Sequence, residues 1–495
     1  MRLNLIKYFA IALSALALAA CSPRDARQAN EMRFGFISEP ATLDPLSPSN
    51  SADGRSILFN VFEGLVKPDS RGDHLPALAE SFVIGEDGRV YDFTLRANAL
   101  FHDGAPLTPQ DVKFTLDAAI AAGLVGMSAI ESVEITGARG VRVTLRLPDP
   151  DFLPNLTVGV VRAGSENRET VAVGTGPFFI ESHVAQQSLT LRRFDGYWRE
   201  GLPHLDAVTI VFFADLNAMF LALQGGSIDG ALFTGALGGQ LDPARFDVTY
   251  VDSAMVQGLI LNNSAPPLND PLVRQALNHA IDRQEVIDAA FFGQGRQAGG
   301  PVIPGLDLYY EPWLLEAWPH DQAKARELLA QAGFSGGMSL EIVVPSNFTQ
   351  HVDTAQVIVA QLARVGVDAR IRLVDWATWL VDVNRERSYQ ATVISVDGRT
   401  VSPRSFLARY RSDSPSNFIN FSSAEFDRAF DLAQAAQSEE SRIALYREAQ
   451  RAIAREAGSV YIQDILGFMA FRAGAFGGAV GYPLSAMDFA AIYAR

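Results

Sequence analysis

Few side chains in this sequence are arranged for covalent chemistry. His102, in the string Phe101-His102-Asp103-Gly104, has a side chain that can ligate a metal or transfer a proton, but no second histidine lies within a helical turn of it. We therefore interpret His102 as a hydrogen-bonded structural residue. The sequence also contains no His-Glu-x-x-His motif, no Gly-x-Ser-x-Gly motif and only one cysteine. We predict that the protein is not an enzyme and that it carries no cofactor and no metal site.

The one cysteine, Cys21, has a more specific chemical role. A cationic start precedes an apolar run from Tyr8 to Ala20, and small residues stand directly before the thiol. This order is typical of a bacterial lipoprotein signal, after which the cysteine is acylated and becomes the first residue of the mature chain. We predict a signal peptide over 1–20, lipidation at Cys21 and a polar tether over 21–31. The protein would then be held at a membrane by lipid alone, in the periplasm of a Gram-negative cell.

Length and charge narrow the class of protein further. A chain of 495 residues exceeds what one hydrophobic core usually serves, so we expect two or three domains. The formal charge is −15, and loss of the signal peptide would remove two cations and no acid, which leaves −17. This negative charge argues against nucleic acid as a partner. Because there is no second cysteine, stability must come from packing rather than from disulfides.

The elements that would position functional residues are best delimited near the middle of the chain. Asp270 is a candidate N-cap, Pro271 suits the first helical position, and Gly293 and Gly295 end the run, so one helix is predicted between them. Its apolar residues recur at helical spacing on one stripe: Val273, Ala276, Leu277, Ala280, Ile281, Ile287 and Ala290. The sequence therefore predicts an amphipathic helix packed on the body of the protein, after a strand over 256–262.

Helices and strands alternate in the part of the chain that follows. Strands are predicted over 340–344, 369–374 and 391–396, and helices over 321–332, 354–365 and 376–384. This alternation predicts a mostly parallel sheet that is covered on both faces. Two more helices, over 424–436 and 439–457, are expected to cover the same domain before a strand over 461–471 returns toward the first one.

Several strings resemble the signatures of one family. They are T-L-D-P at 42–45, V-F-E-G-L-V at 61–66, F-H-D-G-A-P-L-T-P-Q-D-V at 101–112, G-T-G-P-F at 174–178 and V-R-Q-A-L-N-H-A-I-D-R at 273–283. In this order they resemble the extracytoplasmic solute-binding proteins of the peptide/nickel ABC transporter type, family 5. The fourth string also suggests a phosphate loop, but it lacks the Lys-Ser/Thr pair of a Walker motif. We interpret it as a tight crossing between domains.

The resemblance implies an α/β fold of the two-lobed periplasmic-binding-protein kind, type II, with an accessory α+β domain. The expected parts are 32–54, 172–262 and 472–495 for the first lobe, 55–171 for the accessory domain and 263–471 for the second lobe. The hinge is expected at Leu259, Leu261 and Asn262. In this family a solute is held between the lobes and the closed form is read by an inner-membrane ABC permease with its ATPase. A monomeric receptor for a small solute or an oligopeptide is therefore implied.

The resemblance also selects a loop that contacts the solute. Peptide-binding relatives carry the acid that pairs with an ammonium in a loop G-D-x-x-D-P-x-x-F, and 395–406 corresponds to it here. Ser402 replaces the acid before the proline, so Asp397 is the only acid left, while Gly398, Arg399 and Arg404 complete the loop. Either Asp397 takes the ammonium from a shifted position, or the loop favours a solute with more negative charge or no free amine. The two arginines are equally well explained as solvated residues or as partners of Asp397.

Three further residues complete the predicted site. Glu39, in the loop after the first strand, is a candidate contact from the first lobe, and Trp376 and Trp379 are candidates for stacking on the solute, although helix packing explains one of them as well. The solute itself stays open: a peptide-like solute, or a metal chelate, opine or sugar derivative on the same fold. A secreted hydrolase or a peptide chaperone built on this scaffold is the alternative from another class.

Overall fold

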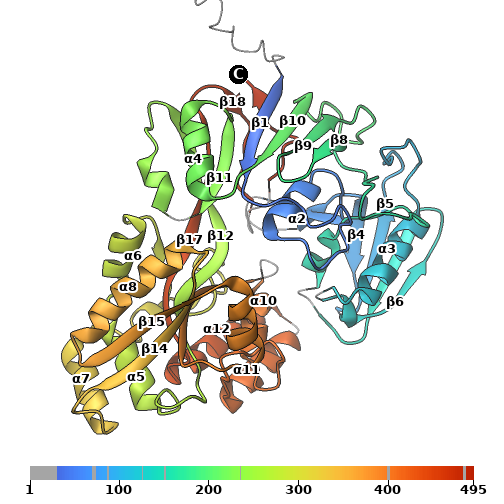
Figure 1. The fold of residues 1–495 in the computed structure, drawn as a ribbon. Coiled ribbons are helices and arrows are strands. Elements are labelled where there is room, and N and C mark those ends of the chain that lie inside the picture. The colour runs from blue at the N-terminus through green and yellow to red at the C-terminus, as the bar shows by residue number, and fades with distance from the viewer. Residues whose placement is uncertain are drawn as a thin grey trace, which may run out of the picture.

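The protein consists of two lobes and an accessory domain, which Figure 1 shows in a computed structural model. The structure describes residues 30–69, 74–85, 88–124, 126–149, 152–234, 236–398, 402–436, 438–482 and 487–495. The predicted signal peptide, Cys21 and most of the predicted tether lie outside these residues. Among the described helices, none is long and apolar enough to cross a membrane.

One sheet of eleven strands, counted over the described residues, runs through both lobes in the order β15-β14-β16-β12-β17-β11-β1-β10-β9-β8, with β13 (Arg296–Gln297) beside β17. The long antiparallel strands β12 (Phe246–Leu261) and β17 (Val460–Arg472) connect the lobes. The first half of β12 pairs only with β17, which continues to β11 (Gly230–Thr234), and the second half also pairs with β16 (Ala391–Asp397). The sheet therefore changes lobe near the middle of β12, well before its end.

The first lobe is built on parallel strands extended by a hairpin. β1 (Glu31–Phe36) pairs in parallel with β10 (Ala207–Phe212) and β11, and the antiparallel strands β9 (Ser188–Arg193) and β8 (Phe178–Val184) follow. α4 (Leu216–Gly225) begins at the N-cap Asp215 and buries Met219 and Leu223 in the lobe. The chain ends here, where β18 (Phe476–Gly477) pairs with β19 (Tyr493–Ala494) and Phe489 packs against Phe34.

The accessory domain has its own antiparallel sheet, β4 (Ala79–Ile84), β5 (Val90–Leu95), β7 (Gly140–Leu145) and β6 (Ile130–Ile135). α3 (Pro109–Ala121) packs on it and begins with a capping box between Thr108 and Asp111. The connection from β1 contributes α2 (Ala52–Leu58), β2 (Val66–Pro68) and β3 (His74–Pro76). Buried apolar residues of this domain, such as Tyr91, and of the first lobe, such as Phe34, belong to one continuous core.

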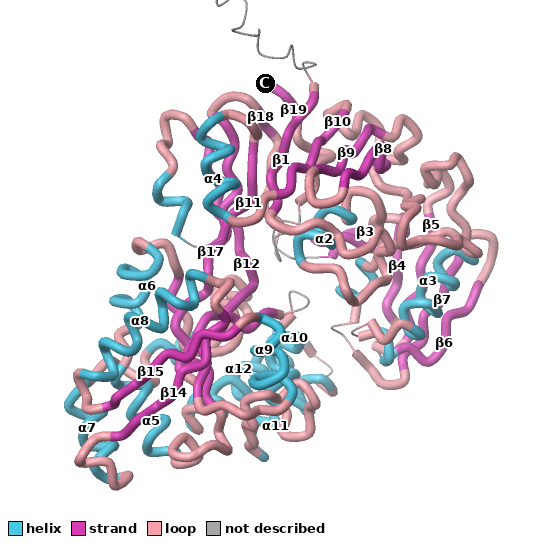
Figure 2. The backbone as a smooth tube through the Cα atoms, viewed as in Figure 1, coloured by secondary structure: helices cyan, strands magenta, loops and turns pink. Residues whose placement is uncertain are grey.

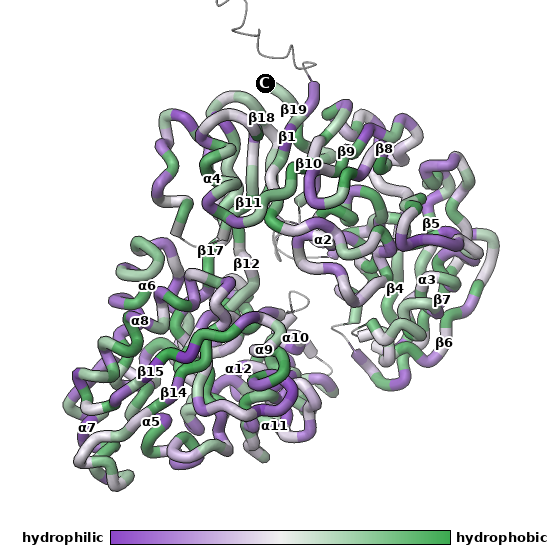
Figure 3. The backbone as a smooth tube through the Cα atoms, viewed as in Figure 1, coloured by the Kyte–Doolittle hydropathy of each residue, from purple (hydrophilic) through white to green (hydrophobic). Residues whose placement is uncertain are grey.

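The second lobe confirms the predicted parallel sheet that is covered on both faces. β14 (Met338–Pro345), β15 (Val367–Val374) and β16 run in parallel. The helices lie in two layers, as Figure 2 shows: α5 (Pro271–Ala280), α6 (Arg283–Phe291), α7 (Gln322–Gln331) and α8 (Thr349–Ala363), then α10 (Pro403–Leu407), α11 (Ala424–Gln434) and α12 (Glu439–Arg455). A separate apolar core lies under each layer. In Figure 3 hydrophobic residues follow much of β14.

Two predicted helices differ in detail from the prediction. The single helix expected from Asp270 to Gly293 is two helices, α5 (Pro271–Ala280) and α6 (Arg283–Phe291). The break occurs because Ile281 is extended and the Asp282 carboxylate accepts from the amides of Gln284 and Glu285, which starts a new helix. The predicted helix over 376–384 begins as α9 (Trp376–Trp379) and continues as a π-helix, η5 (Leu380–Arg385).

Short 3-10 turns complete the connections: η1 (Met127–Ala129), η2 (Leu153–Thr157), η3 (Ala236–Gln240), η4 (Pro312–Leu315) and η6 (Ala408–Tyr410).

Candidate functional site

The directions of the strands bring two carboxyl edges to the same junction. In the first lobe β1, β10 and β11 are parallel to one another and antiparallel to β17, so they end on the side from which β17 arrives. In the second lobe β14, β15 and β16 are parallel to one another and antiparallel to β12, so they end on the side from which β12 arrives. Ligands of open α/β sheets bind outside the carboxyl ends of the strands. The junction between the lobes is therefore the candidate site.

Asp397 and Gly398 lie at this junction. Asp397 ends β16 opposite Met255, and the amide of Gly398 donates to the carbonyl oxygen of Ala254 at 3.4 Å. Gly398 is required here because a Cβ at this position would lie 2.5 Å from the ring of Phe406. The Arg409 guanidinium donates to the backbone carbonyl of Asp397 at 2.7 Å and reaches its carboxylate only at 3.4 Å. The Asp397 side chain is 56% exposed, so its carboxylate faces solvent.

The remainder of the predicted loop has other roles in the structure. Ser402, which replaces the expected acid, is the N-cap of α10 and accepts from the amide of Ser405 at 3.2 Å, with Pro403 in the first helical position. The Arg404 guanidinium forms an ion pair with Asp149 of the accessory domain. Arg399 lies outside the described residues. Of the two arginines, Arg404 therefore contacts an acid of another domain rather than Asp397.

The two candidate tryptophans stack on each other. Their ring centroids are 4.9 Å apart with an interplanar angle of 6°, and the indole N–H of Trp379 donates to Thr392 Oγ1 at 3.0 Å. Trp379 is 5% exposed and belongs to the core under α10–α12, whereas Trp376 is 38% exposed. Phe348, which directly precedes α8, meets Trp376 edge to face at 5.4 Å. Trp376 is therefore the accessible member of an aromatic cluster that follows the carboxyl ends of β14 and β15.

Glu39 lies in the first lobe, in the loop that follows β1. Its carboxylate accepts from His183 Nε2 and from the amide of Gln186, both at 3.0 Å. The backbone N–H of Gln186 is the main reason why the pKa of Glu39 is lowered, and His183 contributes to the same effect. Both partners belong to β8 and the turn after it, so Glu39 fixes that turn against the loop after β1.

The predicted hinge residues lie within the second lobe. Leu259 and Leu261 are fully buried in the core beneath α5 and α8, and the amide of Leu261 donates to Ser459 Oγ at 3.2 Å. The irregular part of β12 comes earlier: its pairing with β17 shifts register between Asp252 and Val256, and Ala254 within this bulge has a φ of 55°.

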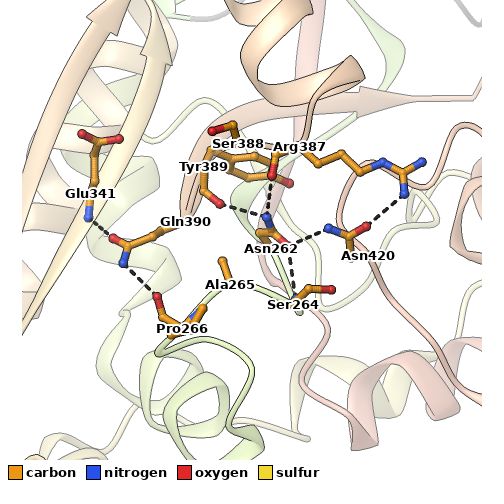
Figure 4. Close-up of a pocket in the computed structure, with 10 residues that line it drawn as sticks. All are labelled: Asn262, Ser264, Ala265, Pro266, Glu341, Arg387, Ser388, Tyr389, Gln390 and Asn420. Carbon is orange, nitrogen blue, oxygen red and sulfur yellow. Dashed lines mark hydrogen bonds between the residues drawn. The ribbon is translucent and has the colours of Figure 1, made fainter.

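Asn262 occupies the opposite end of the second-lobe sheet from Asp397. It lines an open pocket of about 610 Å³, shown in Figure 4. Its amide nitrogen donates to the carbonyls of Arg387 and Tyr389, and its oxygen accepts from the Ser264 amide and from Asn420. These four bonds use the hydrogen-bonding capacity of the side chain toward protein groups. Asn262 therefore ties together the loops at the amino end of β16.

His102 has the structural role that was predicted. Nδ1 accepts from the amide of Gly174 at 3.2 Å and Nε2 donates to the carbonyl of Gly176 at 3.0 Å. Burial lowers the pKa of His102 to about 4, which keeps the ring neutral. A Cβ on Gly174 would lie 1.9 Å from the carbonyl oxygen of Val61, in agreement with the tight crossing predicted for this string. Among the described residues no group of three or more His, Cys, Asp or Glu side chains is placed to hold a metal.

A buried acidic site lies where the accessory domain, the first lobe and the C-terminal segment meet. The Glu63 carboxylate accepts from Tyr197 Oη and from Trp198 Nε1, both at 2.8 Å. Burial raises the pKa of Glu63 to about 7, against the lowering effect of these two donors and of Lys67. Burial would also raise the pKa of Asp488, but Lys67, whose Nζ is 2.7 Å away, contributes to a net lowering.

Comparison with known proteins places these features in a wider group. Residues 74–418 match the family model described as bacterial extracellular solute-binding proteins, family 5 Middle. Heme-binding protein A of Haemophilus influenzae is 26% identical over 516 residues, covering 92% of this chain and 93% of that protein. Glutathione-binding protein GsiB of Salmonella typhimurium is 30% identical over 379 residues, covering 73% of each.

Solved structures of solute-binding proteins are also similar to this chain. The binding protein AgaA of A. tumefaciens R10, in complex with agropinic acid, is 26% identical with a TM-score of 0.79, covering 94% of this chain and 99% of that one. The ABC transporter substrate-binding protein CtaP of Listeria monocytogenes has a TM-score of 0.84 at 23% identity, with 94% and 99% covered, which shows the fold.

Proposed function

Because the chain belongs to the bacterial extracellular solute-binding proteins of family 5, the substrate-binding components of ABC transporters, we propose that it is a lipoprotein that captures a peptide-like solute between its lobes. The solute would pass to an inner-membrane permease with its ATPase. The lipid anchor would be attached at Cys21, and the protein would act as a monomer in the periplasm. Its relatives are solute-binding proteins rather than enzymes, which agrees with the lack of recognisable catalytic motifs in the sequence.

One observation carries the assignment of an amine-bearing solute. At the junction of the two carboxyl edges, the Asp397 carboxylate is exposed and only weakly engaged by Arg409. An accessible carboxylate at the end of a central strand can accept charge-assisted hydrogen bonds from an ammonium. Trp376, with its exposed ring, would offer an apolar surface to a side chain of the same solute.

A non-peptide solute is the second candidate, and two relatives favour it. The structure of AgaA was determined with agropinic acid, and it covers nearly the whole of this chain. Heme-binding protein A also aligns with nearly the whole of this chain. The replacement of the acid before Pro403 by Ser402, which instead caps α10, is consistent with a solute other than an ordinary peptide.

The test is a thermal-shift screen of the purified protein combined with native mass spectrometry of whatever solute is recovered with it. The panel contains one tetrapeptide with a free amino terminus, its N-acetylated form, an opine, a metal chelate and a heme. A ligand at 100 times its Kd stabilises the folded state by about 2.7 kcal/mol, which raises the melting temperature measurably. We expect the tetrapeptide with a free amino terminus to raise the melting temperature more than its N-acetylated form does. If no peptide shifts melting while another compound does, the peptide assignment is wrong and the second candidate stands.

A further inference from the structure

The ion pair between Arg404 and Asp149 joins parts of the molecule that are far apart in sequence. Arg404 lies on α10 of the second lobe, and Asp149 follows β7 in the accessory domain. The Asp149 side chain is 8% exposed and the Arg404 side chain 33% exposed, so the pair is partly shielded from solvent. Figure 1 shows α10 on the side of the second lobe that faces the accessory domain. The contact therefore crosses from one lobe to the domain attached to the other.

Each end of this ion pair is anchored in a different core. The backbone carbonyl of Asp149 accepts from Tyr91 Oη at 2.6 Å, and Tyr91 is fully buried in the accessory domain. On the other side Phe406 and Leu407 of α10 are buried in the core of the second lobe. Because each end is attached to buried residues of its own core, a force on the ion pair acts on two packed bodies. A surface ion pair between mobile side chains would not have this effect.

We propose that Arg404 and Asp149 form a strap that ties the accessory domain to the second lobe before any solute binds. In this arrangement Arg404 restrains the separation of the lobes. A solute carboxylate that approached this guanidinium would compete with Asp149 for it. The strap therefore differs in kind from the contact of the exposed Asp397 carboxylate, whose ion-pair partner among the described residues, Arg409, belongs to the same lobe.

Hydrogen–deuterium exchange of the full-length protein without added solute tests the strap. The variants are Asp149→Asn, which keeps the shape of the side chain and removes its charge, Arg404→Gln, which replaces the guanidinium by a shorter uncharged amide, and the double variant. We expect each single variant to speed exchange of amides in both 403–411 and 140–149 by about threefold to tenfold, since a partly shielded ion pair contributes on the order of 1 kcal/mol. The double variant should exchange no faster than either single variant, because both remove the same interaction.

Arg142→Gln is the matched control. Arg142 pairs with Asp92 at 2.7 Å entirely within the accessory sheet, so its loss should leave exchange of 403–411 unchanged. The strap is overturned if each single variant affects only its own segment, if neither affects exchange, or if the effects multiply in the double variant. Since no solute is present, these results stand whether or not the protein binds a peptide.

Discussion

Trp376 and Trp379 lie face to face, with their ring centroids 4.9 Å apart, yet one ring is buried and the other is open. Trp379 is fixed in the core by its hydrogen bond to Thr392 and by Phe418, whose ring contacts it edge to face at 6.0 Å. Trp376 receives support from Trp379 and Phe348 and leaves its other surface accessible. Substitution of the two tryptophans should therefore have different effects on the free energy of unfolding and on solute binding.

Trp379→Ala should lower the free energy of unfolding by about 3–5 kcal/mol, because it empties a packed core position and leaves Thr392 without its donor. Trp376→Ala should cost only about 0.5–1.5 kcal/mol, the value of a stacked aromatic pair, but should weaken solute binding. Denaturant unfolding and solute titration of both variants separate the two effects. Equal losses of stability would contradict the assignment of Trp376 as a supported surface for solute.

Asp397→Asn should weaken binding of a free tetrapeptide about tenfold to a hundredfold, since a hydrogen bond to a charged group contributes about 1.5–3 kcal/mol. Binding of the N-acetylated tetrapeptide should not change. Isothermal titration calorimetry of wild type and variant with both peptides provides the measurement. Glu39→Gln serves as a comparison, because Glu39 is engaged by His183 and Gln186 in the first lobe. An equal loss for both peptides would exclude Asp397 as the ammonium contact.

Glu63 should make the protein less stable as the pH rises toward neutrality. Its pKa is raised from 4.5 to about 7 by burial, so the folded form holds this proton more tightly than the unfolded chain. The contribution is complete below about pH 4.5, where both forms are protonated, and is lost as the pH rises through about 7. Between about pH 4.5 and pH 7 the free energy of unfolding of wild type should therefore fall by on the order of 2–3 kcal/mol more than that of Glu63→Gln.

Urea unfolding of wild type and Glu63→Gln at pH 5 and pH 7.5 checks this expectation. The comparison between the two proteins cancels the titration of other groups, such as His351, whose pKa is lowered to about 3 by burial. The exposed Glu316→Gln is the control and should follow wild type. Parallel pH dependence of wild type and Glu63→Gln would show that Glu63 does not titrate differently in the folded state.

Leu261→Pro tests where the lobes bend. We predict from the sequence that proline here hinders closure and leaves each lobe folded, but the structure leads us to expect a fold defect. The Leu261 amide donates to Ser459 and its side chain is fully buried, so proline should lower the free energy of unfolding by about 3 kcal/mol or more. Leu261→Val keeps the amide and is the control. A stable Leu261→Pro protein would support a hinge at Leu261; otherwise the bulge around Ala254 is the better candidate.

Local sequence patterns predicted the elements well, and they missed most contacts of the site. Caps and periodicity placed the parallel strands of the second lobe, and the isolation of His102 indicated its structural role. The pairing of Arg404 with Asp149 was not predictable, because 255 residues separate them and neither stands in a distinctive motif. Arg409 was missed for a simpler reason: its contact with Asp397 depends on where η6 lies after α10, the helix that Ser402 caps.

The break at Ile281 shows a second limit of periodicity. Apolar residues continue at helical spacing through the break and both helices bury them, so the stripe alone predicts one helix. The signal was present in Asp282, a second N-cap residue in the middle of the run.

The single apolar core that runs from Phe34 to Tyr91 has a consequence for engineering this molecule. The accessory domain cannot be deleted as an independent unit. Its removal would expose the apolar face of the first lobe that packs against it, and the truncated protein would aggregate. Any swap of this region between relatives has to carry its matching partners in β1 and the C-terminal segment. Inheritance of the accessory domain is therefore tied to that of the lobe on which it rests.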